Sequence, residues 1–297
     1  MAEITRRRTG EFLRKLFEIL QKNPDGVPAR DALTVLGSGF QLSEYERGEY
    51  PSGGRRFENI VRFATVDCTK AGWLVKSKGR WSVTDAGKTA FKNYNDPEVF
   101  YKEAVKLYHA WKSNQPDSGN ANESEIEDAT SGKAVSITFE TSEEQAWAEI
   151  EHYMHGMQPM EFQELVADLL RAMSYHVSWV SPPGKDGGID ILAHTDPLGT
   201  RPPRIKVQVK RKKDPVTSEG LRSFMALLSD DDVGLFVTLS GFTKDAAEEA
   251  RTQEKRKITL IDLENLFDLW VEYYGKLSDD ARRRLPLRPI YFLAPET

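Results

Sequence analysis

Three polar residues in the second half of the chain have the types and the spacing of a metal-dependent hydrolytic site. Asp190 is flanked by two isoleucines, and a carboxylate inside an apolar strand is costly to bury unless it meets a cation or a metal ion. In the alternating segment 204–211, RIKVQVKR, a period of two puts Gln208 and Lys210 on one face of a strand. Side chains on neighbouring antiparallel strands lie about 5 Å apart. A carboxylate, a second oxygen ligand and a nearby lysine suit the Mg²⁺-dependent hydrolysis of a phosphodiester.

An α/β domain is predicted around these residues because helix and strand patterns alternate. The apolar residues of 162–173 recur at helical spacing, whereas the segments 189–193 and 204–212 read as strands. The later elements follow in this order: strands at 176–180, 233–239 and 257–261, and helices at 218–228, 244–254 and 263–274. Such an order predicts a central mixed sheet flanked by helices.

The first part of the chain is predicted to be mainly helical with a single hairpin. Helical spacing covers residues 12–20, 29–36 and 55–71. Two short β-rich runs follow around Lys78–Gly79, and a further helix begins near Thr84. Three helices followed by a short hairpin are the order of a winged helix-turn-helix domain.

The excess of acidic residues lies in one central stretch. The net charge is −5, yet the first 112 residues are net basic and the acids gather between residues 113 and 160. Residues 113–135 carry almost no large apolar side chain, so they cannot bury enough surface to offset ordering. We therefore predict a winged-helix domain over 1–112, a flexible acidic linker over 113–140 and an α/β domain over 141–297.

The composition excludes several classes of protein. Hydrophobic residues make up 39% and charged residues 29%, and no apolar run approaches the roughly 18 residues of a membrane span. The basic N-terminus lacks the apolar stretch of a secretory signal. A single cysteine, Cys68, excludes a disulfide framework and a multi-cysteine zinc site. We expect a cytoplasmic protein with no membrane partner.

The motifs of the α/β domain closely resemble those of the Mrr-type restriction endonucleases. This family is a branch of the PD-(D/E)xK nucleases in which Gln replaces the usual acid of the motif. The resemblance rests on the helix that begins near Phe162, on GKDGGID at 184–190 and on QVKR at 208–211, and it covers about residues 159–270. It implies a restriction-endonuclease-like mixed sheet. The predicted winged helix is similar to the N-terminal domain of Mrr-type proteins.

The resemblance also implies a role for each residue of the motif. Asp190 corresponds to the metal-binding carboxylate, and Gln208 is a neutral oxygen ligand in place of the acid. Lys210 orients the attacking hydroxide and offsets negative charge in the transition state. The implied cofactor is Mg²⁺, for which Mn²⁺ can substitute.

A further site residue is expected on the helix. The family commonly carries an acid directly after its Phe, and this chain has Gln163 there, with acids at Glu161 and Glu164. At about 100° per residue, Gln163 lies at the edge of the apolar stripe and Glu164 faces away from it. We therefore expect Gln163 to take this place. Two Gln and one Asp would hold a divalent cation weakly.

Basic residues in two places, the strand that carries Gln208 and Lys210 and the predicted N-terminal hairpin, are candidate DNA contacts. The strand that carries the motif and the residues after it form a run of bases without an acid, which favours phosphate contact. The hairpin of the winged helix is also basic. The residues we expect to contact DNA are Arg204, Lys206, Arg211, Lys212, Lys78 and Arg80.

Taken together, the motifs predict a metal-dependent DNA endonuclease of the restriction class. The resemblance implies cleavage that depends on base modification, with double-stranded, methylated DNA as the partner of the winged helix. Because one site cuts one strand, we expect a homodimer or a larger homo-oligomer. The alternative is a winged-helix DNA-binding protein with a weakened or inactive nuclease fold, which the missing acid at Gln163 favours.

Overall fold

The protein forms two compact units. The computed structural model describes residues 4–50, 54–114, 125–184 and 187–292, without the side chains of 125–136. One unit is formed by Met1–Glu149 with Tyr291–Thr297, and the other by Ile150–Ile290. None of the helices in the described ranges combines the length and the apolar character needed to cross a membrane.

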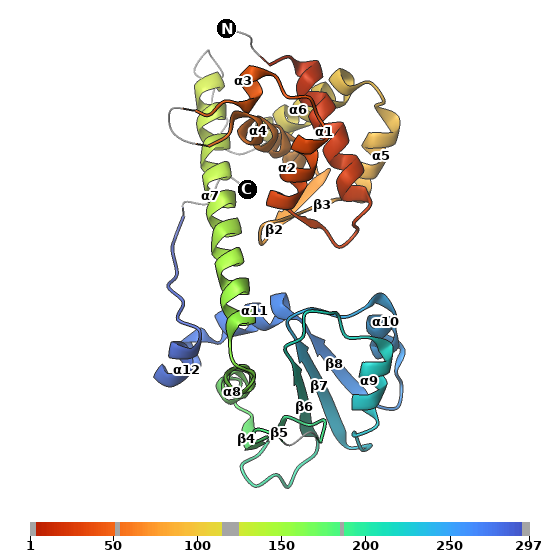
Figure 1. The fold of residues 1–297 in the computed structure, drawn as a ribbon, viewed down its shortest axis with the longest axis vertical. Helices are drawn as coiled ribbons and strands as arrows, with labels where there is room; N and C mark the ends of the chain where they lie inside the picture. Colours follow the sequence, from red (N-terminus) through yellow and green to blue (C-terminus); the bar gives the residue numbers. More distant parts are fainter. Residues whose placement is uncertain (1–3, 51–53, 115–124, 185–186, 293–297) are drawn as a thin grey trace. The chain divides into compact units, whose positions relative to one another are not determined.

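The N-terminal unit has helices packed on a small antiparallel sheet, as Figure 1 shows. Its elements are α1 (Arg6–Gln21), β1 (Val27–Pro28), α2 (Ala29–Ser38), α3 (Glu44–Arg47), α4 (Arg56–Lys70), β2 (Leu74–Ser77), β3 (Arg80–Val83), α5 (Asp85–Asn93) and α6 (Pro97–Ser113). The strand order is β1-β3-β2. The apolar stripe of α1 is fully buried against Trp81 and Phe100, which anchor one core. The helices α1, α2 and α4 and the β2–β3 hairpin have the predicted element order, whereas β1, α3 and α6 were not predicted.

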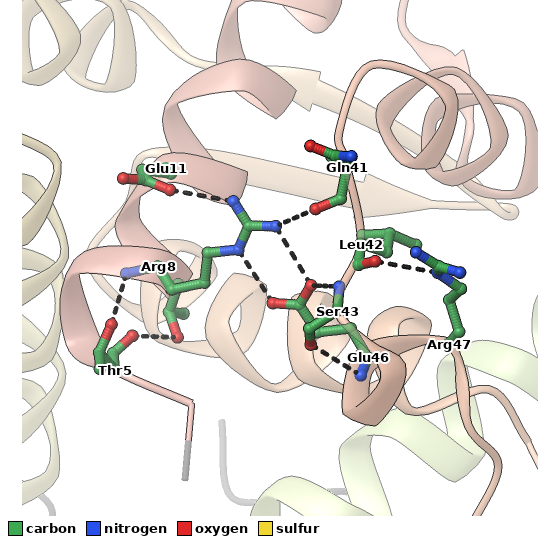
Figure 2. Close-up of polar contacts among 9 residues, drawn as sticks. Thr5, Arg8, Glu11, Gln41, Leu42, Ser43, Glu46 and Arg47 are labelled. Carbon is green, nitrogen blue, oxygen red and sulfur yellow. Dashed lines mark hydrogen bonds and ion pairs between the residues drawn. The ribbon is translucent and has the colours of Figure 1, made fainter. Parts of the chain in front are cut away.

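An ion pair between Arg8 of α1 and Glu46 of α3 connects the two helices (Figure 2). The guanidinium of Arg8 donates through Nε to Oε1 of Glu46 at 2.9 Å and through Nη2 to Oε2 at 3.1 Å. Glu46 also accepts from the main-chain N–H of Ser43 at 2.8 Å, which completes a capping box at the start of α3. Burial alone would raise the pKa of Glu46, but the hydrogen bonds from Arg8 and Ser43 hold that pKa below its ordinary value.

The central acidic segment departs from the prediction of a flexible linker over 113–140. Helix α6 ends at Ser113, and α7 runs from Glu125 to Gly156, so residues 125–140 are helical; residues 115–124 lie outside the described ranges. The boundary between the compact units falls within α7, after Glu149, and not at 112 or 141. The physical reason is that α7 is anchored by a buried acid, Glu140, whose carboxylate pairs with cations of the N-terminal unit. Composition alone does not reveal such a partner.

The C-terminal unit is a five-stranded mixed sheet with helices. It comprises α8 (Pro159–Ala172), β4 (His176–Val180), β5 (Ile191–His194), β6 (Arg204–Lys210), α9 (Ser218–Met225), β7 (Asp232–Thr238), α10 (Lys244–Thr252), β8 (Lys257–Ile261), α11 (Leu263–Glu272), a short 3-10 turn and α12 (Asp279–Arg284). The strand order β4-β5-β6-β7-β8 is antiparallel up to β6 and parallel from β6 to β8. This arrangement confirms the predicted mixed sheet (Figure 1).

The central strand β6 is buried on both faces. Phe224 of α9 and Phe236 of β7 pack edge to face at 5.4 Å in an apolar cluster that also includes residues of α10 and β8. The register pairs Gln208 with Phe236, so Gln208 lies on the same face of the sheet as this cluster. Val207 is fully buried on the opposite face. The fold thereby holds the polar residues of β6 between packed apolar layers.

Candidate active site

Asp190 is held in place through both its main chain and its side chain. Its N–H donates to the carbonyl of Val207, and its carbonyl accepts from the N–H of Ser181, each at 2.8 Å. Carboxylate Oδ2 accepts from the N–H of Val209 at 2.7 Å, and Oδ1 accepts from Nε2 of Gln163 at 2.8 Å. The carboxylate therefore lies where α8, the start of β5 and the end of β6 meet.

Helix α8 brings Gln163, and neither neighbouring acid, to Asp190. The apolar stripe of the helix faces the sheet, and Gln163 lies at the edge of this stripe. Glu164 is partly exposed and contacts Nη1 of Arg171 at 3.4 Å. Glu161 caps the first turn of the helix. The helical geometry expected from the sequence thus agrees with the observed contacts.

Gln208 is oriented by the turn before β5. Its Nε2 donates to the carbonyl of Gly188 at 2.9 Å. Gly188 has a φ of +75°, which an L side chain rarely adopts, and a Cβ at this position would lie 2.6 Å from Cδ1 of Leu227. The φ of this turn therefore favours glycine, a side chain there would also displace the end of Leu227, and the carbonyl of Gly188 fixes which end of the Gln208 carboxamide points toward the turn.

Two amide oxygens at this site have unmet acceptor capacity. Within the described residues, Oε1 of Gln163 and Oε1 of Gln208 are both buried and have no hydrogen-bond partner. A buried acceptor left unpaired is destabilising by about 1–3 kcal/mol, so such atoms call for an explanation. Both belong to side chains whose NH₂ groups are already engaged, one of them by Asp190.

A hard divalent cation fits this donor set. Mg²⁺ and Mn²⁺ are bound by carboxylate and carbonyl-type oxygens, and here one carboxylate, Asp190, accompanies the unpaired oxygens of Gln163 and Gln208. In the described part of the chain no three His, Cys, Asp or Glu residues gather in a possible metal cluster. Of these three described residues, two would contribute neutral oxygens and one a carboxylate.

Lys210 lies beyond Gln208 on the same face of β6. The parallel register pairs Lys210 with Thr238, and its Nζ is 5.3 Å from the centroid of the Phe236 ring. The ring packs against the lysine and limits the positions its ammonium can take. A carboxylate, two amide oxygens and an ammonium at one end of β6 form an arrangement that can hold a divalent cation together with a phosphate.

Two predicted DNA contacts have other partners. Nζ of Lys206 is buried, pairs with Oδ2 of Asp232 at 2.8 Å and donates to the carbonyl of Leu227 at 2.6 Å. Nε of Arg204 pairs with Oδ1 of Asp232 at 2.9 Å. Burial would raise the pKa of Asp232, but the hydrogen bonds from Arg204 and Lys206 hold it far below its usual range. Lys206 and Arg204 thus both pair with Asp232, and a contact of either residue with DNA stays a prediction.

The other predicted DNA contacts of the C-terminal unit follow β6. Arg211 is partly buried, and its Nη1 donates to the carbonyl of His155 in α7. Lys212 is exposed in the loop after the strand. Of these two cations, Lys212 therefore retains the accessibility that a phosphate contact needs.

The predicted contacts of the N-terminal unit lie on the β2–β3 hairpin. Nη2 of Arg80 donates to the carbonyl of Gly26 at 2.8 Å, which ties the hairpin to the turn before β1. Nζ of Lys78 is 5.5 Å from the centroid of the Trp147 ring of α7. Both side chains are partly buried, which the sequence did not indicate.

The sequence did not indicate the roles of two acidic residues, Asp232 and Glu140, which pair with the cations described above. Asp232 is the last of three consecutive aspartates and the first residue of β7, and its partner Arg204 is revealed only by the parallel register of β6 and β7. Glu140 lies in a segment whose composition suggested a linker. The signal that could have identified it is Ile137, an apolar residue one helical turn earlier that is buried with it.

Two domain families match the chain. Residues 154–270 match the Mrr catalytic family, described as a restriction endonuclease, and residues 10–93 match the Mrr N-terminal domain. The chain is 24% identical over 282 residues to the type IV methyl-directed restriction enzyme EcoKMrr of Escherichia coli (strain K12), covering 88% of this chain and 91% of that enzyme.

A solved structure is also similar to part of the chain. This is the MspJI restriction endonuclease in complex with a 27-mer oligonucleotide, with 19% identity and a TM-score of 0.35. The similarity covers 69% of this chain and 47% of that chain, so it spans about half the length of that protein.

The family matches agree with the fold, and the range of the catalytic family includes the candidate site. The catalytic family covers the unit with the mixed sheet, which is the restriction-endonuclease-like fold, and it includes Asp190, Gln208 and Lys210. The N-terminal family covers the helices and the hairpin of the other unit, and the similar enzyme aligns over nearly the whole length of both proteins. The chain therefore belongs to the Mrr-type restriction endonucleases.

Proposed function

We propose that this DNA endonuclease of the restriction class hydrolyses phosphodiester bonds with the help of a divalent cation, Mg²⁺ or Mn²⁺. The observation that carries the proposal is the pair of buried, unpaired oxygens of Gln163 and Gln208 beside the carboxylate of Asp190. These three residues would hold the cation. A bound cation would stabilise the negative charge that develops on the phosphate.

The remaining steps depend on the side chains of the chain itself. Asp190 is held rigidly by main-chain and side-chain hydrogen bonds, so it keeps its position without reorganisation during the reaction. The ammonium of Lys210 attracts the scissile phosphate, donates a hydrogen bond to the attacking water and offsets charge in the transition state. Gly188 keeps the carboxamide of Gln208 turned so that its oxygen remains available.

We further propose that cleavage depends on base modification. The similar enzyme is described as methyl-directed, and it aligns with both units of this chain. In this proposal the N-terminal unit selects methylated duplex DNA and the C-terminal unit cuts it. Since one site cuts one strand, a homodimer or larger homo-oligomer would cut both. A DNA substrate and a single buried cysteine, Cys68, are consistent with action in the cytoplasm.

The test is nicking of supercoiled plasmid, unmodified or methylated, with Mg²⁺ or Mn²⁺. Asp190→Ala should reduce cleavage to below about 1% of the wild type, because catalytic groups of this kind contribute factors of about 10² or more. Lys210→Ala should have a similar effect. Lys244→Ala, which removes an exposed lysine at the start of α10, is the matched control and should cleave as the wild type does.

Binding of duplex DNA measured in EDTA distinguishes the loss of a metal ligand from the loss of a DNA contact. Asp190→Ala should bind DNA as the wild type does, since it removes a metal ligand and no phosphate-binding cation. Cleavage by Asp190→Ala above a few per cent of the wild type would contradict the assigned site. Equal and negligible cleavage by all variants and the wild type, with binding retained, would instead favour a DNA-binding protein with an inactive nuclease fold.

A further inference from the structure

A compact group of cations lies where α4 meets the β2–β3 hairpin. Arg62 of α4 and Lys76 of β2 both lie near the Trp81 ring, with Cζ of Arg62 5.5 Å and Nζ of Lys76 4.9 Å from the ring centroid. Lys78 stands at the tip of the hairpin. We call Arg62, Lys76, Lys78 and Trp81 the hairpin surface. Cations interleaved with an aromatic ring are typical of surfaces that bind nucleic-acid phosphates.

One carboxylate of α7 occupies the centre of the hairpin surface. Oε1 of Glu140 accepts from Nη1 of Arg62 at 2.8 Å and from Nε1 of Trp81 at 2.8 Å. Its Oε2 accepts from Nζ of Lys76 at 2.6 Å. The side chains of Arg62 and Glu140 are each only 8% exposed, so this ion pair is almost withdrawn from water.

Two further acids of α7 cover the rest of the hairpin surface. Oε2 of Glu144 pairs with Nη2 of Arg62 at 2.7 Å. The carboxylate of Glu143 accepts the main-chain N–H of Lys78, and burial outweighs this hydrogen bond and holds the pKa of Glu143 above its ordinary value. At the hairpin tip, a Cβ on Gly79 would lie 3.0 Å from Cα of Glu144, so the two backbones are in close contact.

The spacing of these three acidic residues along α7 explains why their carboxylates all meet the hairpin surface. Glu140, Glu143 and Glu144 are spaced i, i+3 and i+4, which places their carboxylates on one face of α7. We call these three residues the acidic face. Figure 1 shows α7 running alongside α4 and the hairpin within the N-terminal unit. Each cation of the hairpin surface thus faces α7, two of them paired with a carboxylate and Lys78 beside Trp147.

A buried charge that loses its partner is strongly destabilised, unless it gains water or another anion. If the acidic face moves away, the cations of the hairpin surface become available to a chain of phosphates. Helix-turn-helix domains likewise present a helix to the major groove of DNA. The acidic face and duplex DNA would therefore compete for the same groups.

We propose that the hairpin surface is a DNA-binding surface and that the acidic face of α7 occupies it until duplex DNA displaces it. The inference rests on the proposed role of the N-terminal unit in DNA recognition. It adds that the acidic face competes with DNA and so lowers the apparent affinity for duplex DNA. When only a fraction of the molecules has an open surface, the measured affinity falls by that fraction.

The test is duplex affinity of the full-length protein, measured by fluorescence anisotropy in EDTA so that no cleavage occurs. Glu144→Gln weakens the hold of the acidic face and should bind at least about fivefold more tightly than the wild type. Glu149→Gln is the matched control, because it removes one negative charge from an exposed position on the same helix. It should bind within about twofold of the wild type. Adding Lys78→Ala to Glu144→Gln should abolish most of the gain.

A reversible cross-link provides a comparison within one protein. A Cβ on Gly79 would lie 3.2 Å from Cβ of Glu144, close to the roughly 3.5–4.5 Å of a disulfide, and the native Cys68 is fully buried. We expect Gly79→Cys/Glu144→Cys to bind duplex at least about tenfold more weakly when oxidised than after reduction. Any strain from the substitutions is common to both states.

The outcomes separate this inference from the proposed function. Equal binding by the oxidised and reduced forms, or by a folded Glu144→Gln and the wild type, would overturn the displacement and leave DNA recognition by the N-terminal unit intact. A gain in Glu144→Gln that survives Lys78→Ala unchanged would show that the hairpin surface is not the site of binding. Thermal unfolding of each variant establishes that the compared proteins are folded.

Discussion

The candidate site of this endonuclease differs from an all-carboxylate metal site at two residues. Among the three proposed ligands, Gln163 and Gln208 present neutral oxygens and Asp190 supplies a carboxylate. Each neutral oxygen binds a divalent cation more weakly than a carboxylate does, but it also repels an incoming phosphate less. We therefore expect weak metal binding in the absence of DNA, with Mn²⁺ supporting cleavage at least as well as Mg²⁺.

Changing one neutral ligand to an acid tests this description. Gln208→Glu adds a carboxylate beside Asp190, so metal affinity measured by calorimetry should rise by about tenfold or more. Without metal the two acids repel, so the unfolding temperature in EDTA should fall and should recover when Mn²⁺ is added. Gln41→Glu, an exposed position with the same change in charge, should alter neither quantity. Unchanged metal affinity in Gln208→Glu would remove Gln208 from the proposed ligands.

The ion pair between Arg8 and Glu46 predicts how the stability of the fold depends on pH. Because the folded protein lowers the pKa of Glu46, its ionised form stabilises the fold above the ordinary pKa range, and this contribution is lost as the pH falls through the lowered value. Glu46→Gln should lower the free energy of unfolding by about 2 kcal/mol at pH 7, as expected for a hydrogen bond to a charged group. The difference from the wild type should shrink below about pH 4.

Urea unfolding of both proteins across this pH range measures the effect. Glu18→Gln provides the control, since Glu18 forms an exposed pair with Lys15 on the same helix as Arg8. Such a pair contributes about 0–1 kcal/mol, so the control should show little difference at any pH. A constant difference between Glu46→Gln and the wild type down to pH 3 would contradict the assigned charge.

At the scale of elements, the turn before β5 determines how Gln208 is presented. Gly188→Ala introduces a side chain at φ +75° and against Leu227, so it should displace the carbonyl that holds Gln208. We expect plasmid cleavage to fall by about tenfold or more, since small displacements of positioning groups have effects of this size. Gly187→Ala is the neighbouring control because a Cβ there meets nothing within 4 Å. Similar rates for the two variants would show that the turn does not position the site.

Most elements of both units could be predicted from the sequence because their apolar residues follow a clear period. The apolar stripe of α8 even indicated which side chain, Gln163 or Glu164, would face the sheet. The strand period placed Lys206 on the same face as Gln208, but period alone does not reveal that Asp232 and the end of α9 enclose that lysine. Partners contributed by distant segments are set by tertiary packing, which a local pattern does not contain.

Helix α7 shows the same limit at greater length. Residues 113–135, which include its first turns, carry almost no large apolar side chain, a composition typical of a solvated linker. The residue that contradicts this, Glu140, is buried because Arg62, Lys76 and Trp81 lie in positions to receive it. Those three residues come from two different parts of the chain, a helix and a hairpin, and their convergence is a property of the folded unit.

At the scale of the whole molecule, each compact unit has its own core, so the units can be studied apart. The fragment 1–112 lacks the acidic face, whereas 1–149 retains it. We expect 1–112 to bind duplex DNA with an affinity that falls steeply with salt, because phosphate contacts release counterions. The fragment 1–149 should bind at least about fivefold more weakly at the same salt concentration.

Anisotropy titrations at several salt concentrations measure both quantities. Glu140→Gln/Glu144→Gln in the 1–149 fragment keeps the chain length and should recover most of the affinity of 1–112. If 1–112 shows no binding, or binding that is insensitive to salt, the N-terminal unit is not the DNA reader.

The chromosome of a cell that makes this enzyme is itself duplex DNA. If the acidic face lowers the affinity of the hairpin surface for duplex DNA, the same contact protects that chromosome. Mutations that spare the cell from a harmful form of the enzyme should gather at Asp190 and Lys210. Mutations that make a tolerated form toxic should gather instead at Glu140 and Glu144 and at Gly79, where any side chain presses on α7. A genetic selection for each phenotype would therefore separate two sets of positions, one that cuts and one that restrains.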